Sequence, residues 1–408
     1  MVEQLILKTL YYQGETLGRD LGAGLGLKFS LIESHVDALK HQHLIVVKKS
    51  SGIGSISAIF HLTDAGRQQT REYITSCQYC GVAPVPLSQY IPMVHKQRHP
   101  DSWLSPEMLR KAFQHMVVTP ELITRVGPAV NASKSFLIYG QPGNGKTYLA
   151  EALFGLDPTP VYIPYALEHQ GMIIQVFDPL YHEPVAESNK TSVTSIASAP
   201  ACDQRWIRVK RPFIVTGGEL DLPLLDLSFN EVSRYYDAPL QLKANNGIYL
   251  IDDFGRQKAT PAQILNRWIV PMERHVDYLT LKNGSKVNVP FECFLIFSSN
   301  LKPDQLGDEA FLRRIQYKML LRNPDEGEFC KIFERVCKQH DLPFQPELLE
   351  RFLEKYYRKT GKKRRRCHPR DVLEHAMDLI RFERKPWQLT DEILDHAYDS
   401  CFVAGDED

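Results

Sequence analysis

Apolar and polar positions are spaced differently in successive parts of the chain, and each spacing predicts a different kind of element. In the first 76 residues, apolar residues at helical spacing predict a short helix around residues 5–12 and a second over residues 30–39. Two apolar runs, at 44–47 and 56–62, predict strands on either side of a turn rich in Gly and Ser. Thr63 then suits the N-cap of a last helix in this region.

Further along the chain the pattern changes twice. Five prolines between residues 77 and 106 predict a linker, because each interrupts regular structure. From about residue 107, apolar strand-like runs alternate with helical patterns, which predicts an α/β domain with a parallel sheet over residues 107–322. Residues 323–408 are mostly helical in pattern and are the predicted C-terminal lid.

The N-terminal pattern over residues 1–76 resembles a winged-helix module, an α+β fold that binds DNA or other proteins. Its eight basic residues nearly balance its seven acidic residues. The candidate recognition helix, residues 29–43, carries Glu33 and Asp37 beside Lys40. Because a DNA reader usually offers several Arg or Lys to phosphates and base edges, this composition favours docking to protein, with DNA as the alternative.

The overall composition describes an ordinary folded protein. Hydrophobic residues make up 43% of the 408 residues and charged residues 24%, and 49 basic residues balance 49 acidic ones. A protein that coats nucleic acid over its whole surface is therefore excluded. No apolar run approaches the length of about 18 residues that a membrane span needs, and the N-terminus lacks the pattern of a secretory signal, so we expect a cytoplasmic protein.

The cysteines give a weak metal signal. Cys77 and Cys80 are the one closely spaced pair, and a tetrahedral zinc site needs four ligands. His61 or His95 could complete such a site, while reduced thiols are the alternative interpretation.

A phosphate-binding loop is the strongest motif in the sequence. It follows an apolar strand-like run, 135–139, and precedes a helical pattern that ends at Gly155. Glycines let backbone N–H groups surround phosphate oxygens, and the helix N-terminus adds partial positive charge. Lys146 then reaches the β- and γ-phosphates, and the Thr147 hydroxyl ligates Mg²⁺. The loop is Gly140-Gln141-Pro142-Gly143-Asn144-Gly145-Lys146-Thr147.

Two further strand ends carry polar groups suited to the same chemistry. The apolar run 248–251 ends in Asp252 and Asp253, and the run 294–299 ends in Asn300. Ligands bind at the carboxyl ends of strands in open α/β sheets. Asp252 is therefore a predicted Mg²⁺ ligand through water. Asp253 stands where a general base usually polarises the attacking water, although Glu is more usual there, and Asn300 can contact the γ-phosphate and that water.

Arginines complete the predicted site. Residues 308–315 predict a short helix that ends in Arg313 and Arg314, and an arginine entering a neighbour's site would stabilise the transferring phosphoryl group. Arg314 is the first choice and Arg313 the second, and local salt bridges are the alternative for both. Arg370 follows Pro369 at a predicted helix start, where it could reach back to the nucleotide. The basic run from 355 to 370 fits a solvated or inter-subunit face, or a nucleic-acid patch.

Taken together, these motifs resemble the AAA+ ATPase family over residues 107–403. A predicted hairpin around Asn283-Gly284 resembles the AAA+ group with an insertion before the sensor strand. More narrowly, the stretches 217–222, 252–257 and 265–271 are similar to prokaryotic ATPases with chaperone-like activity that are named for pilus assembly. About a hundred residues between Thr147 and Asp252 exceed a minimal core of this family.

The resemblance implies an ATP hydrolase that uses ATP and Mg²⁺ and assembles into a homo-oligomeric ring, most often of six subunits. It also implies a remodelling or chaperone-like motor on a macromolecular client, for which protein is favoured over DNA. A nucleotide-switched winged-helix DNA-binding regulator is the rival hypothesis. An adaptor that binds ATP and hardly hydrolyses it is a third, because Asp253 replaces the usual Glu.

Overall fold

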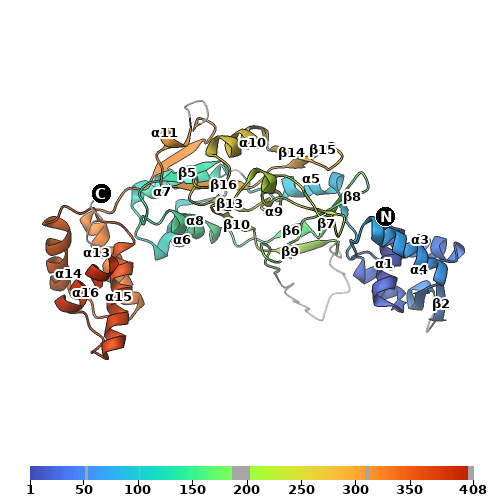
Figure 1. The fold of residues 1–408 in the computed structure, drawn as a ribbon, viewed down its shortest axis with the longest axis horizontal. Helices are drawn as coiled ribbons and strands as arrows, with labels where there is room; N and C mark the ends of the chain where they lie inside the picture. The colour runs from blue at the N-terminus through green and yellow to red at the C-terminus, as the bar shows by residue number, and fades with distance from the viewer. Residues whose placement is uncertain (51–53, 101, 186–202, 308–311, 403–408) are drawn as a thin grey trace.

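The computed structural model describes residues 1–50, 54–100, 102–185, 203–307 and 312–402. Three parts follow one another along its long axis: an N-terminal module, a central α/β body and a group of C-terminal helices (Figure 1). The first and last of these lie at opposite ends of the molecule. No helix among the described residues is long and apolar enough to cross a membrane.

The N-terminal module contains the helices and the two longer strands that the sequence predicts. Thr63 caps its last helix by accepting a hydrogen bond from the backbone N–H of Gly66 (3.0 Å), as predicted. An additional two-residue strand pairs with β3, so the sheet has the order β1-β3-β2. The elements are α1 (Val2–Gln13), β1 (Thr16–Leu17), α2 (Gly18–Gly24), α3 (Phe29–His41), β2 (Ile45–Ser50), η1 (Ser55–Ser57), β3 (Ala58–Leu62) and α4 (Asp64–Ser76).

The segment expected to be a linker, residues 77–106, is part of the folded body. It forms β4 (Val85–Pro86) and α5 (Leu87–Lys96), and Val85 and Tyr90 are almost completely buried. Proline counting predicts breaks in regular structure, but Pro86 lies at the N-cap of α5, where its missing N–H costs little. Pro86 and Pro106 therefore mark the starts of helices, while Pro92 lies inside α5, so this segment is not an extended connection.

A second sheet, which the sequence did not predict, is built mostly from the long stretch between Thr147 and Asp252, with β4 as an edge strand. Its order is β11-β12-β8-β7-β4, and the predicted hairpin β14–β15 packs on the same apolar cluster. These short strands lack the long apolar runs that identify a buried strand. Besides β4, the strands of this sheet are β7 (Ala166–His169), β8 (Met172–Gln175), β11 (Ser228–Phe229) and β12 (Tyr236–Asp237). The hairpin strands are β14 (Val276–Thr280) and β15 (Lys286–Pro290). The same part of the chain also forms a separate strand pair, β6 (Val161–Pro164) and β9 (Trp206–Val209), and the short helices η3 (Leu222–Leu225) and α9 (Leu240–Lys243).

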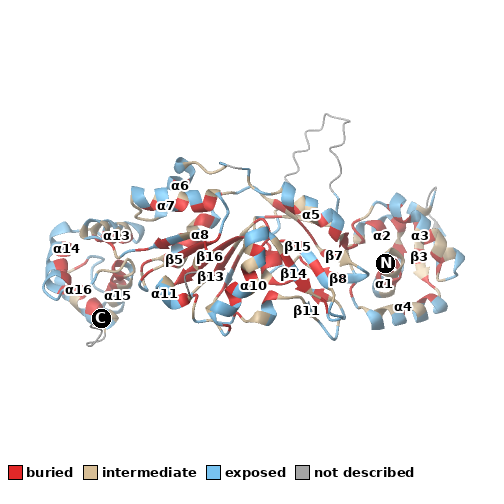
Figure 2. Ribbon diagram, turned by 90° about the horizontal axis from the view of Figure 1, so that it is seen from above, coloured by how far each residue is buried: buried red, intermediate tan, exposed pale blue. Residues whose placement is uncertain are grey.

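The main sheet is parallel throughout, as predicted for an α/β domain. Its order is β10 (Phe213–Thr216), β13 (Ile248–Ile251), β16 (Phe294–Ser299), β5 (Phe136–Tyr139) and β17 (Tyr317–Leu320). The strands and the inner helix faces form continuous buried layers (Figure 2). The surrounding helices are α6 (Pro106–Ala112), the single turn η2 (Phe113–His115), α7 (Pro120–Asn131), α8 (Lys146–Phe154), α10 (Pro261–Arg274) and α11 (Pro303–Leu306).

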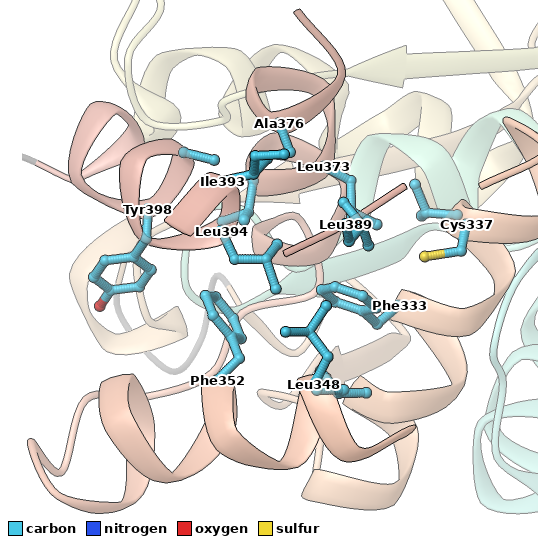
Figure 3. Packing of buried hydrophobic residues seen from close by; sticks show 14 of the residues in the cluster. Phe333, Cys337, Leu348, Phe352, Leu373, Ala376, Leu389, Ile393, Leu394 and Tyr398 are labelled. Atoms are coloured by element: carbon cyan, nitrogen blue, oxygen red, sulfur yellow. The ribbon is translucent and has the colours of Figure 1, made fainter. Parts of the chain in front are cut away.

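The C-terminal helices form a separate apolar core, whose side chains Figure 3 shows at close range. Phe333, Phe352 and Leu394 meet in its centre and are each at most 4% exposed. The helices are α13 (Glu326–Gln339), α14 (Pro346–Leu353), a single π-helical turn η4 (Glu354–Arg358), α15 (His368–Glu383) and α16 (Asp391–Cys401). Residues 359–367 connect the π turn to α15, and we call the last four of them, residues 364–367, the docking loop.

Candidate functional site

The phosphate loop, the two acidic residues and Asn300 lie along one edge of the parallel sheet. β5 leads into the phosphate loop, β13 into Asp252 and Asp253, and β16 into Asn300. Because the strands are parallel and paired in register, their carboxyl ends meet at this edge. The sheet therefore brings together three motifs that are spread between residues 140 and 300 of the sequence.

The phosphate loop has the backbone of an anion-binding turn. Gly143 and Gly145 have φ angles of 80° and 81°, in the left-handed region that favours glycine. A Cβ on Gly140 would lie 2.4 Å from the carbonyl oxygen of Leu321, so the close approach of the chain immediately after β17 also requires glycine there. The loop ends at the N-terminus of α8, where unpaired N–H groups and the helix dipole attract negative charge.

Lys146 lies at the centre of a short polar chain. Its ammonium donates to the carbonyl oxygens of Gly140 (3.0 Å) and Gln141 (3.1 Å) and to Oδ1 of Asn300 (2.6 Å). The Asn300 amide in turn donates to Oδ1 of Asp253 (2.7 Å). Burial lowers the pKa of Lys146, and the nearby carboxylates of Asp253 and Asp252 partly oppose this shift.

Thr147 and Asp252 form a second contact across the sheet edge. The Thr147 hydroxyl donates to Oδ2 of Asp252 (2.8 Å), whose other oxygen accepts the backbone N–H of Asp253 (3.0 Å). A hydroxyl and a carboxylate are the oxygen ligands that Mg²⁺ prefers, so these residues fit the predicted ion. Among the described residues, no group of three or more His, Cys, Asp or Glu could hold a metal. Thr147 and Asp252 supply two oxygen ligands, and Mg²⁺ commonly completes its six positions with water and phosphate oxygens.

Gln257, which is not among the predicted site residues, shapes the turn at Asp252 and Asp253, which we call the acidic turn. Gln257 donates to the backbone carbonyls of Asp252 (2.8 Å) and Asp253 (3.2 Å) and accepts from the N–H of Gly255 (2.7 Å). Asp253 has a φ of 48°, a left-handed conformation that aspartate tolerates better than most residues. In the sequence, the one sign of this role is an amide side chain shortly after two acidic residues and a glycine.

The two candidate finger arginines have different surroundings. Nε of Arg314 lies 3.4 Å from Oε1 of Glu273 at the end of α10, and its side chain is 26% exposed. Arg313 is exposed, and its guanidinium has no hydrogen bond or ion pair with the described residues. Most of the predicted helix 308–315 falls on residues 308–311, which lie outside the described residues.

The structure does not bring Arg370 to the phosphate loop. Its guanidinium pairs with Asp371 (3.0 Å) and lies 3.9 Å from Glu374, and its side chain is 62% exposed. The docking loop occupies the position next to the phosphate loop instead. The backbone N–H of Cys367 donates to the Gly143 carbonyl (2.8 Å), and the Arg365 side chain approaches the same glycine.

Acidic side chains neutralise much of the basic run within the C-terminal helices. Arg358 pairs with Glu326 and with Glu350, and Arg364 pairs with Glu326 (3.2 Å). Arg366 makes two hydrogen bonds of 3.0 Å to Glu328, where both side chains are at most 15% exposed. A sequence count of charges cannot see these partners, which lie up to 38 residues away.

Comparisons with known proteins give limited matches. A family model described as a domain of unknown function, DUF8689, matches residues 325–400, which are the C-terminal helices. No curated protein matches the chain in sequence at a significant level.

Among solved structures, the chain is similar to NtrX from Brucella abortus, at 11% identity and a TM-score of 0.40, over 68% of this chain and 53% of NtrX. A complex of that protein with ADP matches at 13% identity and a TM-score of 0.38, over 74% and 55% of the two chains. A mutant of RuvB from Thermotoga maritima matches at 14% identity and 0.37, over 74% and 73%. The chain thus spans about half the length of NtrX.

Proposed function

We propose that the chain is an ATP hydrolase of the AAA+ type. The observation that carries this proposal is the set of contacts that joins the phosphate loop to the neighbouring strand ends. Lys146 contacts Asn300 at 2.6 Å, Asn300 contacts Asp253 at 2.7 Å, and Thr147 contacts Asp252 at 2.8 Å. A glycine turn with an exposed lysine would need none of these contacts.

Each residue has a role that follows from its chemistry. Backbone N–H groups of the loop and the Lys146 ammonium bind the phosphates and stabilise negative charge on the γ-phosphoryl oxygens. Asn300, held between Lys146 and Asp253, orients the attacking water, and the Asp253 carboxylate accepts its proton. Thr147 and Asp252 would hold Mg²⁺, which supplies charge neutralisation at the β- and γ-phosphates.

The test is ATP turnover by the full chain and by single variants. Lys146→Ala and Asp253→Asn should each lower the turnover number by about 10²–10⁴-fold, because each removes a charge-stabilising or proton-accepting group. Glu219→Gln is the matched control: this exposed carboxylate lies at the same sheet edge, but its hydrogen bond is to the backbone N–H of Gly217. Turnover that survives Lys146→Ala would refute an ATP hydrolase centred on this loop.

We further propose that the active unit is a homo-oligomeric ring in which Arg313 acts on a neighbour's site. Its exposure and unpaired guanidinium among the described residues favour it over Arg314, which Glu273 engages. Mixing inactive Arg313→Ala subunits with inactive Lys146→Ala subunits should restore part of the turnover, because each supplies what the other lacks. If Arg313→Ala subunits are active alone, and Arg314→Ala subunits are inactive alone but complement Lys146→Ala subunits, Arg314 is the finger.

The N-terminal module, which we propose to be a winged-helix domain, would dock a client protein for remodelling. The internal pairing of Arg358, Arg364 and Arg366 weakens the competing hypothesis of a DNA grip. Salt-dependent binding of duplex DNA, lost on neutralising Lys362 and Lys363, would support the DNA-binding regulator instead.

A further inference from the structure

The docking loop touches the phosphate loop at two successive residues. The N–H of Cys367 donates to the carbonyl oxygen of Gly143 (2.8 Å). The next residue, Asn144, is 1% exposed, and its side chain donates to Oδ1 of Asn323 (2.7 Å) and accepts the N–H of Arg366 (3.4 Å). The docking loop therefore holds the phosphate loop on both sides of the Gly143–Asn144 peptide bond, through the backbone carbonyl of Gly143 and the side chain of Asn144.

Because the Gly143–Asn144 peptide is planar and trans, the contact that holds its carbonyl also fixes the direction of its N–H. Its C=O and its N–H point in opposite directions, so fixing the Gly143 carbonyl toward Cys367 directs the N–H of Asn144 away from the docking loop. Phosphate binding in such turns depends on successive N–H groups facing one concavity. The φ of 80° at Gly143 leaves this peptide dependent on external contacts, because glycine has many alternative conformations.

We propose that the backbone N–H of Cys367 is a positioning group, which fixes the Gly143–Asn144 peptide so that the N–H of Asn144 faces the bound phosphates. This inference rests on the proposed function, because it assigns a role toward the same nucleotide. The affinity of the phosphate loop for nucleotide then depends on the C-terminal helices, through a backbone contact rather than an arginine side chain.

The docking loop is held firmly enough to act in this way. Arg366 is clamped by Glu328 and also donates to the carbonyl of Val117 (2.9 Å). Behind the loop, Nδ1 of the buried His368 accepts the N–H of Arg365 (3.4 Å) and the hydroxyl of Tyr357 (2.9 Å). Burial raises the pKa of the Cys367 thiol to about 12, so this side chain acts as a neutral packing group.

Two substitutions at one position separate the N–H from the thiol. Cys367→Pro removes the N–H, and the φ of −77° at Cys367 lies within the range of proline. Cys367→Ala removes the thiol and keeps the N–H. We expect Cys367→Pro to weaken ADP and ATP binding by about tenfold, the effect of one hydrogen bond, with a smaller change in the turnover number. Cys367→Ala should bind within about twofold of wild type.

The second readout is amide hydrogen exchange without nucleotide. Exchange across residues 143–147 should be faster in Cys367→Pro than in Cys367→Ala. Equal affinities and equal exchange in these two variants would overturn the inference. Wild-type protein that binds neither ADP nor ATP would instead refute the proposed function, while the exchange measurement would still test the orientation of the peptide.

A second pair of variants decides the case if Cys367→Pro does not fold, as judged by circular dichroism. A Cβ on Gly143 would lie 2.6 Å from Sγ of Cys367 but 3.6 Å from its Cβ. Gly143→Ala should therefore weaken ADP binding more in the wild-type background than in the Cys367→Ala background, where the clash is absent. The backbone strain of alanine at this φ is common to both, so equal losses would overturn the inference.

Discussion

His368 makes the C-terminal helices sensitive to acid in a way that can be calculated. The side chain is 4% exposed at the start of α15, and burial, followed by the charges of Arg365 and Lys362, lowers its pKa from 6.5 to about 4. Because Arg365 donates to Nδ1, that atom must be unprotonated, and Tyr357 donates to it as well. Protonation would break both bonds and place a positive charge at the positive end of the helix.

The lowered pKa means that the C-terminal helices lose stability as the pH falls. The unfolded segment takes up a proton near pH 6.5 and the folded one near pH 4, so the stabilisation is complete above pH 6.5 and is lost as the pH falls toward 4. The full loss for this shift is about 3 kcal/mol, and at pH 4.5 it is about 2.5 kcal/mol, or roughly 80-fold in the opening equilibrium. The Asp371 carboxylate favours the protonated imidazole and so opposes part of this lowering of the pKa.

The measurement compares wild type with His368→Asn, whose amide oxygen can accept the same bonds without titrating. Amide exchange of α15 is recorded for both proteins at pH 7, 5.5 and 4.5, and the comparison at each pH removes the intrinsic pH dependence of exchange. His99, whose pKa burial also lowers to about 4, titrates in both proteins and cancels. Protection that declines equally in the two proteins would refute the assignment to His368.

Three further predictions concern the body. Lys243→Met should lower the free energy of urea unfolding by about 2–3 kcal/mol, because the 3% exposed side chain lies 2.9 Å from each of two carboxylates that would lose their partner. Gly247→Ala should destabilise by more than about 2 kcal/mol in the same assay, since its Cβ would lie 2.1 Å from the carbonyl oxygen of Pro212, whereas Gly24→Ala meets nothing within 4 Å and should be neutral or stabilising. Gln257→Leu should lower ATP turnover by about tenfold with little change in ADP affinity, because its amide positions the acidic turn rather than the phosphates.

Local pattern was sufficient to predict the elements that carry the site. The apolar runs before Gly140, Asp252 and Asn300 are long enough to be read as buried strands, and all three are strands of one parallel sheet. Parallel strands place their carboxyl ends together, so the meeting of these residues follows once the strands are identified. Thr63 and Asn283-Gly284 likewise act through near neighbours, as a helix cap and a hairpin turn.

Features that depend on distant partners could not be predicted in this way. The second sheet is built from strands as short as two residues, whose apolar content is too small to register as a pattern. Arg370 stands at a helix start as predicted, but the direction of its side chain is set by Asp371 and Glu374 on the same helix. Which residue of the basic run approaches the phosphate loop depends on how α15 docks, and a charge count contains no information about that docking.

Movement driven by nucleotide should be concentrated at the docking loop. The acidic turn leads into α10, where Arg267 pairs with the 1% exposed Asp277 of β14 (2.6 Å), and Gln241 donates to the same carboxylate (3.1 Å). These buried bonds join α10, which follows the acidic turn, to α9 and to the β14–β15 hairpin. Hydrogen bonds from Arg366 and Cys367 of the docking loop cross to the body, where they end on Gly143 and Asn144 of the phosphate loop and on the carbonyl of Val117, which precedes α7. A change in the conformation of the phosphate loop is therefore transmitted first across this contact, which is the step that the Cys367 variants interrupt.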